Sequence, residues 1–193
     1  MADKMMYRPK AVLGCQTNFS FLCGASHPEE LVAHAHHLGW QAVGIADRFS
    51  CGGLVRAHMA IKDIAAQNNP DQKPVPSLSL DKLICGVGVS LHNGGDILCY
   101  ARTLDGYYSL CQWLSAAMMR SGHNNRALPD MHTSDLGRLS SDVIVITLPP
   151  VLADTDYREQ ARTIRLFAPG DVYVGGYLMR DGCDEERLSL IHI

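Results

Sequence analysis

Short apolar runs rich in β-branched residues alternate along the chain with longer amphipathic stretches. Runs of this kind predict buried strands, and their alternation with helical periodicity is typical of an α/β fold built on mostly parallel strands. The six predicted strands cover residues 11–15, 42–46, 83–90, 97–101, 143–147 and 172–177.

The clearest predicted helix lies between the first two strands. Ser26 can cap it, Pro28 occupies a permitted place in the first turn, and Glu29 follows the cap by three residues, as in a capping box. Gly39 can adopt a left-handed backbone and so predicts the end of the helix. The side chains expected on its buried face are Leu31, Ala35 and Leu38.

Two further helices are predicted over residues 53–66 and 105–120. The positions expected to face inward are Leu54, Ala57, Ile61 and Ile64 or Ala65 in the first, and Leu110, Trp113, Leu114 and Met118 in the second. The segments 68–77 and 121–129 contain proline and asparagine between these periodic stretches, and both are predicted to be loops.

The arrangement of the strands stays open at this point, because periodicity fits both a sheet that closes toward a barrel and an open doubly wound sheet. A complete eight-fold barrel needs ~250 residues, and the chain has 193. The pattern therefore predicts most of one such domain, incomplete at its carboxyl end.

The composition is that of an ordinary globular domain, with 47% hydrophobic and 19% charged residues. No apolar run approaches the ~20 residues needed to cross a bilayer, so we expect a cytoplasmic protein without a membrane partner. Seven cysteines without a C-x-x-C pair predict free thiols. A net charge of -3 without a Lys/Arg cluster argues against DNA binding by this chain alone.

Several histidines and serines could suggest chemistry, but their spacing favours simpler interpretations. His34, His36 and His37 give at most a two-ligand corner on a helix, so they are interpreted as solvated. Ser20 and Ser26 have no His and carboxylate partners placed by the sequence, so no nucleophilic triad is supported.

Two glycines and two aspartates also form short motifs. Gly86 and Gly88 lack the third glycine of a dinucleotide loop, and close strand packing is the preferred explanation. Asp154 and Asp156 form a D-x-D, a kind of carboxylate pair that can hold magnesium, but at a predicted helix start they more simply meet the positive end of the helix dipole.

A resemblance to a known family rests on three segments: TNFSFLCGASHPEELVAHAHHLGWQAVGIADRFSCGGLVRAHMAIKD, DGYYSLCQWLS and SSDVIVITLPP. In order and spacing these resemble the opening of bacterial error-prone DNA polymerases, paralogues of the DNA polymerase III alpha subunit. The resemblance covers residues 11–187 and implies a PHP domain, an α/β fold whose distorted (β/α)7 barrel would be incomplete at the carboxyl end. The final LSLIHI, residues 188–193, resembles a translated sequencing adapter and is expected to be a non-native tail.

In active PHP domains, strand ends present His, Asp and Glu to a cluster of metal ions that hydrolyse phosphoesters. By the resemblance, the ligand positions fall here on Gly14, Gln16, Asp47, Arg48, Gly88 and Asp96. Two of these can still coordinate, and two carboxylates make a poor multinuclear site. We therefore expect no metal and no catalytic residue in this chain, with Arg48 paired instead to Asp47 or Asp96.

The resemblance implies a parent enzyme that extends primers opposite damaged DNA, with magnesium held by palm carboxylates that this chain lacks. Its expected partners are the remaining polymerase domains, DNA bound through the parent, and replication and mutagenesis accessory proteins. The chain itself would be a non-catalytic scaffold that carries no cofactor. Two alternatives stay open: an active metal-dependent phosphoesterase or 3'-5' proofreading exonuclease of the same fold, and a free-standing interaction module.

Overall fold

The protein is described by a computed structural model that covers residues 11–67, 82–121, 129–150, 157–177, 180, 182 and 184–189. Six strands form one sheet, in the order β1-β2-β3-β4-β5-β6. Their bounds are β1 Ala11–Cys15, β2 Ala42–Arg48, β3 Lys82–Leu91, β4 Gly95–Ala101, β5 Val143–Thr147 and β6 Val172–Val174. Each predicted strand is confirmed, although β6 ends earlier than the apolar run predicted.

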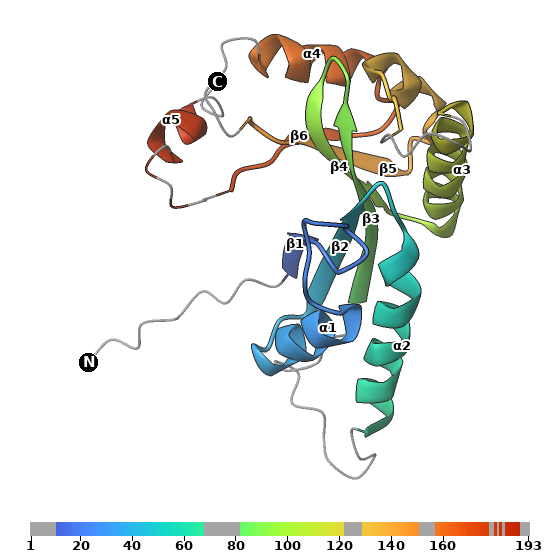
Figure 1. The fold of residues 1–193 in the computed structure, drawn as a ribbon, viewed down its shortest axis with the longest axis vertical. Helices are drawn as coiled ribbons and strands as arrows, with labels where there is room; N and C mark the ends of the chain where they lie inside the picture. Colours follow the sequence, from blue (N-terminus) through green and yellow to red (C-terminus); the bar gives the residue numbers. More distant parts are fainter. Residues whose placement is uncertain are drawn as a thin grey trace.

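The sheet is mixed, and the prediction of mostly parallel strands is confirmed with one exception, β4. The pairs β1–β2, β2–β3 and β5–β6 are parallel, whereas β4 runs antiparallel to both of its neighbours. A short turn joins β3 to β4, and a connection of that length can link only antiparallel strands. The strictly sequential order excludes a doubly wound sheet, in which the strand order reverses. The sheet instead curls into a half-barrel (Figure 1).

The helices divide the core into two clusters. Helices α1 (Pro28–His37) and α2 (Gly52–Gln67) pack beside β1–β3, and α3 (Leu104–Arg120), η1 (Thr133–Arg138) and α4 (Tyr157–Phe167) pack beside β3–β6 (Figure 1). A short helix, α5 (Asp184–Ser189), follows β6. Cys51, at the start of α2, contacts both clusters. Tyr107 of α3 also packs against the cluster of α1 and α2, so the two helical layers meet near the start of α2 and beside α3.

The start of α1 differs from the prediction by one residue. His27 is the N-cap, and its backbone N–H donates to Glu30 Oε2 at 2.8 Å. Ser26 instead contributes its carbonyl, which accepts from the Asn18 N–H at 2.9 Å. The helix ends as predicted, because Gly39 has a φ of 72°.

Most positions predicted to face inward are buried or half-buried, and the clearest exceptions lie toward the carboxyl ends of the helices. In α1, Ala35 is buried as predicted, Leu31 is only half-buried and Val32 is buried instead, whereas the side chain of Leu38, beyond the last turn, is 43% exposed. In α3, Leu110, Trp113, Leu114 and Ala117 are buried, whereas Met118 is 45% exposed. In α2, Leu54 and Ala57 are buried, and Ile61 and Ile64 pack partly buried against the same cluster.

No helix in the described part of the chain is both long and apolar enough to cross a membrane. The six cysteines within the described ranges are free thiols, as predicted. Several predictions lie outside those ranges: the loop at 68–77, most of the loop at 121–129, the pair Asp154 and Asp156, and the end of the tail at 190–193.

Candidate functional site

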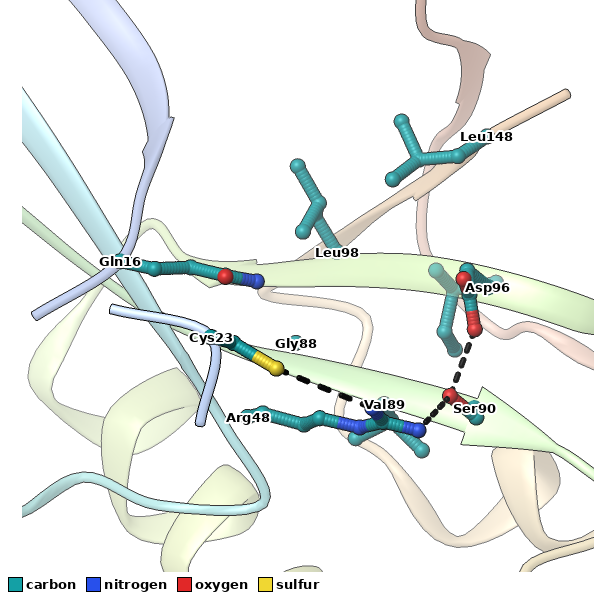
Figure 2. A pocket seen from close by; sticks show the side chains of 10 residues that line it. Gln16, Cys23, Arg48, Gly88, Val89, Ser90, Asp96, Leu98 and Leu148 are labelled. Carbon is teal, nitrogen blue, oxygen red and sulfur yellow. Dashed lines mark hydrogen bonds between the residues drawn. The ribbon is translucent and has the colours of Figure 1, made fainter. Parts of the chain in front are cut away.

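The ends of four strands meet at one edge of the sheet and surround a pocket. The carboxyl ends of the parallel strands β1, β2 and β3 lie at this edge, and the antiparallel strand β4 brings its amino end to the same place. The pocket has a volume of about 240 Å³ and is lined by Gln16, Cys23, Arg48, Gly88, Val89, Ser90, Asp96, Ile97, Leu98 and Leu148 (Figure 2). Four of the six predicted positions, Gln16, Arg48, Gly88 and Asp96, therefore lie together.

Asp47 does not line this pocket. Its carboxylate is buried, 1% exposed, and accepts hydrogen bonds from Thr17 N at 2.6 Å, Thr17 Oγ1 at 2.8 Å and Ser20 Oγ at 2.7 Å. A Cβ added to Gly53 of α2 would lie 2.5 Å from Asp47 Oδ2, so no space remains on that side. Asp47 therefore anchors the loop between β1 and α1, and its oxygens are not available to an ion in the pocket.

Arg48 pairs directly with neither carboxylate among the described residues, which corrects the predicted ion pair. Asp47 and Arg48 are neighbours on β2, and neighbouring side chains on a strand point to opposite faces. The Arg48 guanidinium donates through Nη2 to Ser90 Oγ at 3.2 Å, and Ser90 Oγ donates to Asp96 Oδ1 at 2.6 Å. Figure 2 shows this chain of side chains crossing the pocket from β2 through β3 to β4.

Ser90 is the site residue that the sequence analysis missed. Its position follows from the register of the β3–β4 hairpin, in which Ser90 lies directly opposite Asp96. Alternation along β3 could have indicated it, because Gly88 and Ser90 are two residues apart and share a face. The register itself could not be derived without knowing that β4 turns back on β3.

Arg48 has donors left after these contacts. Its Nη1 lies 4.0 Å from Cys23 Sγ, which is a weak acceptor, and its Nε is buried without a hydrogen-bond partner in the described structure. The guanidinium carbon also lies 5.9 Å from the centroid of the Phe49 ring. A fixed positive charge therefore occupies one wall of the pocket.

The Tyr100 side chain packs against β1 at Gly14. The Tyr100 hydroxyl accepts a hydrogen bond from Gly14 N at 2.7 Å, and Gly14 has a φ of 75° at an irregularity in the β1–β2 pairing. Burial raises the pKa of Tyr100 to about 12, so its phenol is neutral near pH 7. A Cβ on Gly86 would lie 2.4 Å from the Tyr100 ring, which confirms close strand packing at this glycine.

These residues do not fit a cluster of metal ions. Such a cluster needs several carboxylate or imidazole ligands at once. Within the described ranges no group of three or more His, Cys, Asp or Glu side chains could hold an ion. Asp96 already accepts from Ser90, and the Arg48 charge would repel a divalent cation. His34 and His37 are exposed on α1, and His36 is half-buried there.

Fold and site together define a class: a curled, mixed α/β half-barrel whose strand ends surround a pocket with both polar and apolar side chains. The family model of the PHP domain matches residues 13–168. The chain belongs to the PHP domain family, as its sequence resemblance predicted.

The chain is also similar to full-length polymerases. It is 31% identical over 184 residues to the error-prone DNA polymerase of Brucella abortus biovar 1, covering 95% of this chain and 16% of that one. It is 31% identical over 195 residues to the error-prone DNA polymerase of Bordetella parapertussis, covering 94% of this chain and 17% of that one. The chain thus spans about a sixth of the length of the curated relatives it matches.

A solved structure supports the fold alone. A protein from Bifidobacterium adolescentis, named for an inferred metal-dependent phosphoesterase activity, superposes with a TM-score of 0.65 at 14% identity and covers 95% of this chain and 82% of that one. The distorted, incomplete PHP barrel expected from the sequence is therefore confirmed as the fold class.

Proposed function

We propose that this chain is the amino-terminal PHP domain of an error-prone DNA-directed DNA polymerase that acts in translesion synthesis and DNA repair. In this proposal the domain is a scaffold for the polymerase domains, and its metal site is degraded. The similarity to error-prone DNA polymerases over 95% of the chain supports the identity of the parent. The single observation that carries the scaffold role is the Arg48–Ser90–Asp96 chain at the strand ends.

The side chains at the former ligand positions now connect strands. Ser90 joins Arg48 on β2 to Asp96 on β4, and Asp47 joins β2 to the loop after β1. The Asp47 hydrogen bonds are buried, and bonds to charged groups contribute about 1.5–3 kcal/mol each, whereas the Ser90–Asp96 bond is exposed and fixes the direction of its side chains more than it stabilises the fold. Residues that elsewhere in the family would bind ions are thus used here to hold the sheet edge in one shape, which is what a scaffold requires.

The chemistry of the parent lies elsewhere in its sequence. Nucleotidyl transfer requires magnesium ions held by carboxylates beside the primer terminus, and these ions position and neutralise the reacting phosphate. The net charge of -3 on this chain supports a domain that meets DNA only through the parent. The proposed partners are the remaining polymerase domains and the accessory proteins of replication and mutagenesis, in the cytoplasm.

The metal content of the purified chain tests the degraded site. After incubation with Mn²⁺ or Zn²⁺ and desalting, we expect well below one ion per chain by elemental mass spectrometry. We also expect no metal-dependent shortening of a 5'-labelled single-stranded oligonucleotide. Asp96→Asn is the matched control, because it removes the carboxylate that lines the pocket while retaining its shape.

Stoichiometric metal and cleavage that both disappear in Asp96→Asn would contradict the scaffold role and establish the phosphoesterase or proofreading alternative. The parent is tested separately by primer extension on undamaged and lesion-containing templates with the full-length polymerase. A reading frame that stops without polymerase domains in the source genome would instead favour the free-standing interaction module.

A further inference from the structure

Two large apolar side chains stand almost fully exposed on the loop between β1 and α1. Phe21 is 83% exposed and Leu22 is 90% exposed, and they occupy adjacent positions at the tip of this loop. We call these two residues the apolar tip. The whole segment 16–26 contains no Asp, Glu, Lys or Arg. An exposed pair of this size in an uncharged loop is the kind of surface that marks a protein interaction.

The loop that carries the apolar tip is closed on itself. Asn18 N donates to Ser26 O at 2.9 Å across its base, and Ser20 O accepts from both Cys23 N and Gly24 N at 2.9 Å. A Cβ on Gly24 would lie 2.0 Å from Thr17 O, so the two arms of the loop touch through their backbones. The tip is therefore presented in one defined conformation.

The base of the loop is fixed to the sheet by the buried carboxylate of Asp47 through Thr17 and Ser20, both fully buried. Leu22 has a φ of 61°, a left-handed conformation that costs free energy for a residue with a Cβ. Strained backbone persists where its surroundings hold it, and it often accompanies a function. The anchored loop base and the left-handed backbone of Leu22 together hold two apolar side chains out in solvent. Their exposure does not stabilise the domain itself.

We propose that the apolar tip docks into an apolar groove on the polymerase portion of the parent chain, beyond residue 193. This inference rests on the proposed function and names the contact through which the scaffold holds its neighbours. Cys23, the next residue of the loop, lines the strand-end pocket, so the apolar tip is joined directly to one wall of that pocket.

The small size of the apolar tip and its lack of charge favour the polymerase portion of the same chain over a separate protein or DNA as its binding partner. A stable interface between separate proteins buries about 1,200–2,000 Å² in total, which is far more than two side chains can supply. A partner joined covalently is present at high effective concentration, so a small contact suffices. The relatives are about six times longer than this chain, which covers 16% of their length, so most of the parent is available to form the groove. An uncharged tip does not suit the DNA backbone.

Photo-crosslinking in the full-length parent tests the contact directly. With p-benzoylphenylalanine at position 21, irradiation should produce crosslinked peptides that join the loop to residues beyond 193 of the same chain, with the protein remaining monomeric on a denaturing gel. The same probe at Tyr108, which is 54% exposed on α3, is the control for non-specific crosslinking. Crosslinks confined to residues 1–193, crosslinks to a second copy, or none above the control would each overturn the proposal.

A pair of variants in the same full-length chain gives a functional readout. Phe21→Ser with Leu22→Ser should increase hydrogen exchange in the groove at least several-fold and lower primer extension. Phe21→Leu with Leu22→Met keeps the tip apolar and should retain both properties near wild type. Suppose that the wild-type parent extends primers and that the serine variant shows the same hydrogen exchange in the groove as wild type. The docking inference is then wrong, while the proposed function stands. If the wild-type parent does not extend primers, the proposed function fails, whatever the crosslinks show.

Discussion

Asp47 and Arg48 show how adjacent residues acquire opposite roles on a strand. The Asp47 side chain is buried under the β1–α1 loop, and the Arg48 side chain lies in the strand-end pocket. Both positions were predicted from the sequence, with Arg48 expected to pair with either Asp47 or Asp96. Their separation follows from the two-residue period of a strand, which places consecutive side chains on opposite faces.

Replacement of Asp47 by asparagine should destabilise the fold. The asparagine amide can accept at one position but presents N–H groups at the other, so at least one of the buried donors of Thr17 and Ser20 loses its acceptor. We expect the free energy of unfolding to fall by about 2–3 kcal/mol, measured by urea denaturation.

The matched control is Asp96→Asn, whose side chain lies in an open pocket and should change the free energy of unfolding by less than about 1 kcal/mol. Equal stability of Asp47→Asn and wild type would show that the carboxylate does not anchor the loop. The hydrogen bonds assigned to Thr17 and Ser20 would then need reassessment.

Among the elements, β3 and β4 decide the geometry of the site. Their hairpin brings Asp96 opposite Ser90, and β3 lies against β4 closely enough that the Tyr100 ring covers Gly86. The glycine motif was correctly interpreted as close packing, because its spacing lacked the signature of a dinucleotide loop. Its packing partner, Tyr100, lies 14 residues away on a strand whose direction the pattern did not reveal.

Gly86→Ala should therefore be strongly destabilising for a change of one methyl group. The added Cβ would lie 2.4 and 2.5 Å from two Tyr100 ring atoms and 2.8 Å from Cys99 O, and the backbone oxygen cannot move cheaply. We expect a loss of about 1–3 kcal/mol in the free energy of unfolding, seen as a lower urea midpoint.

Gly137→Ala serves as the comparison, because the atom nearest to its added Cβ is 3.8 Å away. This second variant should be as stable as wild type within about 0.5 kcal/mol. Similar urea midpoints for the two variants would show that Tyr100 and β4 can shift to accept a larger residue.

Helix ends were predicted less well than helix centres, for a common physical reason. Leu38 and Met118 continue the apolar period of α1 and α3, but among the described residues no element buries them. Periodicity records which side of a helix is apolar, and it does not record where the opposing layer stops. The N-cap was misplaced by one residue because Ser26 and His27 both precede the proline.

At the scale of the whole molecule, the half-barrel leaves an apolar groove at the β6 edge of the described sheet. The groove has a volume of about 540 Å³ and lies between α4 and β6, lined by Thr147, Arg158, Ala161, Arg162, Arg165, Leu166, Val172 and Val174. Close by, Tyr173 is 53% exposed and Leu166 is 83% exposed. An open strand edge beside exposed apolar side chains favours self-association.

Leu166→Lys combined with Tyr173→Lys should therefore reduce self-association of this chain. Both changes place charge on a surface that is already exposed, so the fold should be retained. We expect several-fold lower binding of a fluorescent apolar dye and a smaller aggregated fraction in size-exclusion chromatography with light scattering.

Leu104→Lys is the control, because Leu104 is 65% exposed on α3, on a different element from the groove. An equal decrease in dye binding and aggregation for this variant would show that general surface charge, and not the β6 edge, determines solubility.

The order of apolar runs and the family segments were enough to predict the strands, the PHP class and four residues, Gln16, Arg48, Gly88 and Asp96, that line one pocket. These features depend on local periodicity and on residue identity, and both can be read directly from the sequence. Tertiary structure alone decided that Asp47 is withdrawn into a loop anchor, that Ser90 connects Arg48 to Asp96, and that Phe21 and Leu22 stand exposed. Each of those outcomes depends on strand direction, register or loop closure between residues distant in sequence, and no local pattern encodes them.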